Sequence, residues 1–212
     1  LLMPAFLEHN GALAVKVVSV FPKNSALGLP VVNALVMVLD SETGIPQALL
    51  EGGTLTAIRT GAASGAATDV LARSDAASVT IIGSGVQART QLEAVCTVRD
   101  IDKVQVFSLN RAEAEGFVAA LAGKGPIPTA ITIANDVNKA VAEADIICTA
   151  TTATTPVFDG HMINPGTHIN GVGSFTPEMQ EVDLATVQRS LVVVDSRTAV
   201  WAEAGDLIIP LE

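Results

Sequence analysis

The sequence predicts an α/β protein in which helices alternate with the strands of a parallel sheet. Three observations support this fold class. Short runs of β-branched and other apolar residues recur along the second half of the chain, helical segments of about ten residues separate them, and a glycine-rich turn follows one of the runs. Strands joined by such helices form right-handed crossovers and therefore a parallel sheet.

The N-terminal part of the chain is predicted to be a different, strand-rich region. Residues 12–20 and 31–39 are rich in Val, Leu and Ala and indicate two strands, with Gly28 and Pro30 in the loop between them. A turn at 40–44 ends the second strand. From Thr56 to Ala72 the apolar residues fall at helical spacing with many small residues between them. This pattern predicts a helix that another backbone or a ligand can approach closely.

The regular alternation of elements begins after this helix. Strands are predicted at 79–82, 103–107, 130–133, 145–149, 168–172 and 191–195, and helices at 86–98, 111–122 and 137–144.

The composition excludes several classes of protein. The 212 residues have a net charge of −10, whereas nucleic-acid binding requires a basic face that neutralises phosphates. No apolar run approaches the roughly 20 residues that span a bilayer, so we expect no membrane partner. The distant cysteines, Cys96 and Cys148, are typical of reduced thiols in a cytoplasmic protein. The histidines do not fall at ligand spacing, which predicts no metal site. Because no Met begins the chain, we expect a fragment.

A glycine-rich turn carries the first functional signal. The segment 83–88 reads Gly-Ser-Gly-Val-Gln-Ala, and it follows the predicted strand 79–82 and opens the predicted helix 86–98. Gly83 permits the tight turn, Gly85 lets the backbone approach a pyrophosphate, and Ala88 packs the helix against the strand. The N-terminus of the helix supplies free N–H groups. In this strand–turn–helix context the motif predicts a Rossmann domain that binds a nicotinamide dinucleotide, and hence an oxidoreductase.

The end of the following strand suggests which dinucleotide is bound. NAD-preferring sites place a carboxylate there, on the ribose 2′-hydroxyl. This sequence has Ser108, Asn110 and Arg111 instead, which favours NADP(H), with NAD(H) as the alternative. Two further turns follow predicted strands, one with Thr149 and Thr151 and one at 172–174, Val-Gly-Ser. Ligands bind at the carboxyl ends of such strands, so these turns are candidates for the nicotinamide pocket.

An ordered set of motifs resembles the ornithine cyclodeaminase/mu-crystallin family over essentially the whole chain. The set comprises Lys16, Phe21-Pro22-x-Asn24, Gly28-Leu29-Pro30, Thr43-Gly44-x-Pro46, Leu55-Thr56-Ala57-x-Arg59-Thr60-x-Ala62-Ala63-Ser64 and the 83–88 turn. The resemblance implies a homodimer in which the Rossmann domain is inserted in a split α+β substrate and dimerisation domain. Its implied boundaries are 1–72 for part of the substrate domain, 73–198 for the Rossmann domain and 199–212 for the start of the return.

The resemblance also implies roles for individual residues. Lys16 would contact the substrate and donate a proton, and Arg59 would clamp a carboxylate or a cofactor phosphate. Both roles are chemically sound, because a guanidinium matches a carboxylate bidentately and a lysine ammonium can donate a proton. Residues that would contact the cofactor are Thr60, Val86, Gln87, Thr149, Val172, Gly173 and Ser174.

Two departures from the family pattern separate the possible reactions. Ornithine cyclodeaminases have an essential Asp where this chain has Phe175, and an acid near the position of Met3, which would here line the substrate site. Neither side chain can hold an ammonium by charge. We therefore expect NAD(P)H-dependent reduction of a cyclic ketimine carboxylate, such as Δ1-pyrroline-2-carboxylate to proline. Alternatives are a cyclodeaminase or alanine dehydrogenase-like enzyme, with Glu178 replacing the lost Asp, and an NADPH-dependent binding protein.

Overall fold

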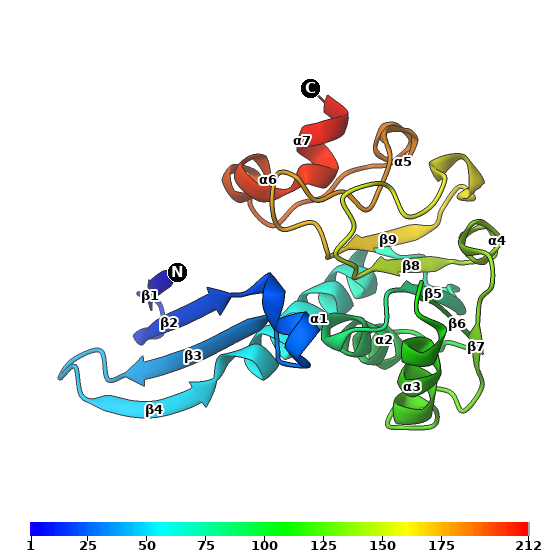
Figure 1. Ribbon diagram of the computed structural model, residues 1–212. Helices are drawn as coiled ribbons and strands as arrows, with labels where there is room; N and C mark the ends of the chain where they lie inside the picture. Colours follow the sequence, from blue (N-terminus) through cyan, green and yellow to red (C-terminus); the bar gives the residue numbers. More distant parts are fainter. Residues whose placement is uncertain (212) are drawn as a thin grey trace. The chain divides into compact units, whose positions relative to one another are not determined.

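The computed structural model describes residues 1–211, without the side chains of residues 22, 25 and 26. The chain divides into two compact units, Leu1–Arg59 and Thr60–Glu212 (Figure 1). The boundary between the units falls inside helix α1, which spans Gly52–Leu71. No helix in the described part of the chain is long and apolar enough to cross a membrane.

The first unit is built on an antiparallel sheet of four strands in the order β1-β2-β3-β4. The 12–20 strand has the predicted bounds, and the second predicted strand begins one residue later, at Val32. The outer strands β1 and β4 were not predicted. All their side chains are exposed, so they lack the alternation of buried and exposed residues that marks a strand in sequence. The bounds are Leu2–Leu7 for β1, Ala12–Val20 for β2, Pro22–Leu27 for the 3-10 helix η1, Val32–Leu39 for β3 and Pro46–Glu51 for β4.

Helix α1 begins four residues before the predicted start because a side chain satisfies its first amides. The Glu51 carboxylate accepts hydrogen bonds from the backbone N–H of Gly53 and of Thr54, each at 2.6 Å. A carboxylate at this position also interacts favourably with the helix dipole. Further along, in the second unit, an added Cβ at Gly61 would collide with Thr90 of the following helix. The close backbone approach that the small residues predicted is therefore confirmed.

The second unit contains a parallel sheet of five strands in the order β7-β6-β5-β8-β9. The predicted α/β class with a parallel sheet is confirmed, and each strand through β9 lies within one residue of its predicted bounds. The elements are β5 Ser78–Ile82, α2 Val86–Val98, β6 Lys103–Phe107, α3 Arg111–Leu121, β7 Ile131–Ile133, α4 Val137–Ala142, β8 Ile146–Thr149, η2 Gly160–Met162, β9 His168–Gly171, α5 Leu184–Arg189, α6 Arg197–Glu203 and α7 Gly205–Leu211.

The core of the second unit lies on both faces of this sheet (Figure 1). Successive strand residues point to opposite faces. On one face, Ile81 and its neighbours pack against α2 and α3, where Leu92 and Phe117 are fully buried. On the other face, Ile82 and Ile147 pack against Val141 of α4. Helices on both faces explain why β5 and β8 are almost continuously buried.

The predicted strand at 191–195 is wrong. These residues form no ladder in the described part of the chain, and Leu191 is 91% exposed. A strand needs a neighbour that accepts and donates its backbone hydrogen bonds, and no described strand pairs with this segment. The three short helices α5, α6 and α7 around it were not predicted.

Candidate functional site

The glycine turn lies where the order of the parallel strands reverses. From β5 the chain runs outward through β6 and β7, and then returns to the other side of β5 as β8 and β9. The Gly83 N–H donates to the Phe107 carbonyl at 2.8 Å, and the Ala150 N–H donates to the Ile82 carbonyl at 2.8 Å. The turns after β5, β6 and β8 are thereby joined at the carboxyl edge of the sheet. Doubly wound sheets bind ligands at this switch point.

The reason for a glycine differs between the two positions of the turn. Gly83 has φ of +111°, and a Cβ there would meet the Ala150 carbonyl. Gly85 has φ of −75°, caps α2 without any side-chain hydrogen bond, and has no atom within 4 Å of where its Cβ would lie. Gly83 is therefore required by the protein itself, whereas the open space at Gly85 and the uncapped helix beside it fit a dinucleotide pyrophosphate.

Several buried polar atoms of α1, α2 and β8 have no partner among the described residues. They include Thr60 Oγ1, Gln87 Oε1 and Thr149 Oγ1, three residues predicted to contact the cofactor, and both side-chain amide atoms of Gln91. Buried polar atoms are nearly always hydrogen-bonded, so atoms without partners are typical of positions that a ligand or water completes. Gln91 lies one helical turn after Gln87 and is fully buried. Its spacing from Gln87 was the sequence signal that could have identified it.

The end of β6 is more acidic than the sequence indicated. Ser84 Oγ lies 3.1 Å from Ser108 Oγ and 3.4 Å from Glu113 Oε2. Asn110 caps α3 through its Oδ1 and donates from Nδ2 to the other Glu113 oxygen at 3.0 Å. Glu113 is thus a carboxylate beside the glycine turn, which sequence reasoning missed because it lies on the next helix rather than at the strand end.

Arg111 does not direct its charge toward this group of residues. Its guanidinium donates to Asn135 Oδ1 at 3.0 Å and forms an ion pair with Glu115 at 3.3 Å. The joint phosphate contact of Ser108, Asn110 and Arg111 stays a prediction. In the structure Asn110 contacts Glu113, Ser108 contacts Ser84 beside that carboxylate, and Arg111 is paired with Glu115 and Asn135.

The turns after β8 and β9 meet at a buried carboxylate. The Val172 N–H donates to the Thr149 carbonyl at 3.0 Å, which continues the ladder past the last residue of β9. Thr151 donates to Glu181 Oε1 through its backbone N–H at 2.6 Å and its hydroxyl at 2.7 Å, and the Gly173 N–H donates to Glu181 Oε2 at 2.6 Å. The structure thus brings the predicted residues Thr151 and Gly173 together, through a residue that the sequence did not single out.

In the first unit, Lys16 is the only polar side chain on one face of the antiparallel sheet. By strand register its cross-strand neighbours are Met3 on β1 and Val36 on β3, and Leu50 on β4 follows in the same row. Lys16 is half-buried on this otherwise apolar face. The face consists of Met3, Ala5, Leu7, Ala12, Ala14, Lys16, Val18, Val20, Val32, Ala34, Val36, Val38, Ala48 and Leu50.

Arg59 is exposed on α1. Within residues 1–211, neither its guanidinium nor the Lys16 ammonium forms a hydrogen bond or an ion pair with a protein group. The first unit therefore presents two cations without protein partners, which is the electrostatic requirement for binding a small anion.

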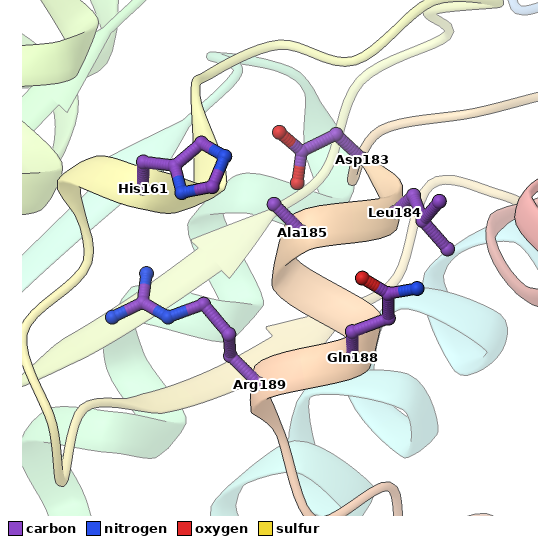
Figure 2. Close-up of a pocket in the computed structure, with 6 residues that line it drawn as sticks. All are labelled: His161, Asp183, Leu184, Ala185, Gln188 and Arg189. Carbon is purple, nitrogen blue, oxygen red and sulfur yellow. The ribbon is translucent and has the colours of Figure 1, made fainter.

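The depression drawn in Figure 2 is not part of this site. It lies between η2 and α5 and is lined by six residues, of which Asp183 and Arg189 lie at opposite ends of α5 (Figure 2). Asp183 caps α5 through the Thr186 N–H at 2.7 Å and also accepts from Gly160. Arg189 donates to the Gly160 and Ile163 carbonyls. The charged groups here are already engaged in holding the chain together.

Comparison with known proteins gives consistent matches. Residues 1–209 match the ornithine cyclodeaminase/mu-crystallin family. The chain is 45% identical over 213 residues to a Δ1-pyrroline-2-carboxylate reductase of Bacillus cereus, covering all of this chain and 65% of that protein. It is 32% identical over 207 residues to the mouse ketimine reductase mu-crystallin, covering 98% of this chain and 64% of that one.

A solved structure is also very similar. It is a Thermococcus litoralis Δ1-pyrroline-2-carboxylate reductase in complex with NADH and L-proline, with a TM-score of 0.94 and 48% identity. The match covers 99% of this chain and 64% of that one. The chain therefore spans slightly less than two thirds of the length of these relatives, and it matches them along its whole length.

Proposed function

The chain belongs to the ornithine cyclodeaminase/mu-crystallin family, and on that premise we propose that it reduces a cyclic ketimine carboxylate. The substrate we propose is Δ1-pyrroline-2-carboxylate, which yields proline, with a nicotinamide dinucleotide as reductant. We also propose the family arrangement, in which residues 73–198 form a Rossmann domain inserted in a split substrate domain that begins with 1–72. One observation carries the choice of reaction: Lys16 is the single charged group on an apolar sheet face.

The proposed chemistry uses two cations of the chain. Arg59 binds the substrate carboxylate through two parallel N–H···O bonds. Lys16 donates a proton from Nζ to the ring nitrogen, becomes neutral, and regains a proton from water. A bound NAD(P)H supplies the hydride that the imine carbon gains. The C=N double bond thereby becomes a CH–NH single bond, with one hydride on carbon and one proton on nitrogen.

The residues that stand where cyclodeaminases carry acids support an imine rather than a diamine. Met3, the cross-strand neighbour of Lys16, is apolar and carries no charge that could pair with a second ammonium. Phe175 is 51% exposed and has no acid–base capacity. Glu178, the alternative acid, is exposed. The compact, uncharged ring of a cyclic ketimine suits this apolar face better than ornithine does.

For the cofactor we propose a preference for NAD(H) over NADP(H), which reverses the expectation from sequence. The Glu113 carboxylate beside Ser84 would accept hydrogen bonds from ribose hydroxyls but would repel a 2′-phosphate. The nearest arginine in sequence, Arg111, is paired with Glu115 and Asn135. The NADH bound in the Thermococcus relative agrees with this proposal.

We propose that the first unit also mediates a homodimer. On the sheet face opposite Lys16, large apolar side chains are exposed, led by Leu2 at 74%, Leu49 at 65% and Phe6 at 55%. An apolar patch of this kind is typical of a protein–protein interface. Light scattering of the purified protein checks the proposal, because a monomeric mass at micromolar concentration would contradict it.

The test mixes the protein with Δ1-pyrroline-2-carboxylate and NADH and follows the loss of NADH absorbance. The assay is then repeated with NADPH in place of NADH, and the product is identified. We expect NADH oxidation with one proline formed per NADH consumed. Proline and ammonia formed from ornithine would instead identify a cyclodeaminase. Tight dinucleotide binding without turnover on either substrate would identify a binding protein.

A further inference from the structure

Glu181 joins the two turns that are candidates for the nicotinamide side of the site. One of its carboxylate oxygens accepts from the N–H and hydroxyl of Thr151, and the other accepts from the Gly173 N–H, at 2.6–2.7 Å. Thr151 follows β8 and Gly173 follows β9, so a single side chain connects the ends of two neighbouring parallel strands.

The burial of Glu181 is unfavourable for the stability of the fold, so stability does not explain its position. The residue has no exposed surface, and no lysine, arginine or histidine of the described chain pairs with it. Burial raises the pKa of this carboxyl, and the hydrogen bonds from Thr151 and Gly173 oppose that effect. Packed apolar side chains usually stabilise a core at least as well as a buried charge does. A buried carboxylate held only by turn donors therefore points to a role in arranging those turns.

The backbone of Glu181 is itself held in place. Asp206 on α7 accepts from the N–H of Glu181 at 2.5 Å and of Val182 at 3.0 Å. The Asp206 N–H donates in turn to Ser174 Oγ, in the turn after β9, at 3.0 Å. The turns also touch directly, because a Cβ on Gly173 would collide with the Thr151 carbonyl and with the Glu181 carboxyl. Neither turn can shift without breaking contacts to Glu181.

We propose that Glu181 is a positioning residue that orients the nicotinamide ring for hydride transfer by fixing these two turns. This inference rests on the proposed function, in which the turns after β8 and β9 hold the nicotinamide half of the cofactor. We assign the adenosine half to the turns after β5 and β6, whose described residues form no hydrogen bond with the Glu181 carboxylate. Loss of Glu181 should therefore affect the two halves of the cofactor differently.

The test compares Glu181→Gln with a matched control, Asp183→Asn. Asp183 also accepts from the N–H and hydroxyl of one threonine, Thr186, and from one glycine N–H, that of Gly160, but it lies at α5. Glu181→Gln replaces one acceptor oxygen by an N–H₂ group that faces an existing donor. We expect Glu181→Gln to lower kcat at least tenfold. In the wild type, NADH should bind more tightly than ADP-ribose because of its nicotinamide half, and the variant should lose most of this difference. The Kd of ADP-ribose itself should change less than twofold. The control should keep kcat within twofold.

Other results would overturn the proposal. Unchanged kcat in Glu181→Gln, or an equal fall in kcat in Asp183→Asn at equal loss of Tm, would mean that Glu181 is only structural. If Glu181→Gln does not fold, Thr151→Val removes one donor to the carboxylate, and an unchanged kcat there would have the same meaning. The comparison of NADH with ADP-ribose needs no turnover. It therefore reports on Glu181 even if the wild-type protein reduces no imine, a result that would contradict the proposed function alone.

Discussion

Met3 lies directly opposite Lys16 in the antiparallel pair of β1 and β2. Cross-strand partners have Cβ atoms about 5 Å apart, so a carboxylate at position 3 would reach the ammonium. We expect Met3→Glu to engage Lys16 in an ion pair and to lower kcat/KM for the imine at least tenfold. Met3→Leu should keep it within threefold. Steady-state kinetics of both variants check this, and full activity in Met3→Glu would argue against a substrate at this face.

Substitutions of Lys16 and of Arg59 should change different kinetic constants. Lys16→Ala removes the proposed proton donor, and such donors contribute roughly 10²–10⁴-fold to rate. Arg59→Lys keeps the charge but loses the bidentate fork, so we expect KM for the imine to rise about tenfold or more with a smaller change in kcat. Circular dichroism should show both variants folded. Normal turnover in Lys16→Ala would contradict its assignment.

Cofactor choice should depend on Glu113. Removing its charge relieves repulsion of a 2′-phosphate, so Glu113→Gln should raise the ratio of kcat/KM for NADPH over NADH about tenfold, or roughly 1.4 kcal/mol. Glu143→Gln removes the same charge from a carboxylate that pairs with Lys103 at the opposite edge of the sheet, and should leave the ratio unchanged. An equal ratio in both variants would mean that Glu113 does not face the ribose.

The two glycines of the turn after β5 should separate stability from binding. Gly83→Ala forces an L-residue to φ of +111° and against the Ala150 carbonyl, so we expect a loss of about 1–3 kcal/mol in unfolding free energy. Gly85→Ala meets no protein atom, so its stability should stay near wild type while the Kd of NADH rises at least tenfold. Gly116→Ala on α3 controls for helix propensity and should leave the Kd unchanged.

The stability contributed by Asp145 should vary with pH. Burial acts to raise the pKa of its carboxyl, but hydrogen bonds from Ser78 and Ala77 and the charge of Arg73 outweigh burial and lower it. A lowered folded pKa stabilises the protein above the ordinary value of 3.8, and this contribution declines as the pH falls through the folded pKa. Asp145→Asn should therefore cost about 1–2 kcal/mol at pH 7 in urea unfolding. The difference from wild type should shrink below pH 3.8, and a constant difference would contradict the assignment.

Local sequence patterns were sufficient to predict the elements in which apolar residues recur at a single helical or strand spacing between turn residues. The bounds of β2, α2 and β6 are those predicted, because each begins and ends at turn residues or helix-start signals in its own segment. The glycine turn was recognised for the same reason, since its strand, turn and helix are contiguous. The segment 191–195 has the composition of a strand and yet has no partner, because composition reports the tendency to pair and not the presence of a neighbour.

By itself, the sequence determined the α/β class, the glycine turn and the family whose motifs include Lys16 and Arg59. The tertiary structure alone decided the contacts between distant positions. Glu181 reaches Thr151 and Gly173, and Glu113 reaches Ser84, across separations that no local period records. Hydrophobic periodicity and turn chemistry act over a few residues, whereas a buried carboxylate is placed by whichever donors the fold brings within 3 Å, about the length of one hydrogen bond.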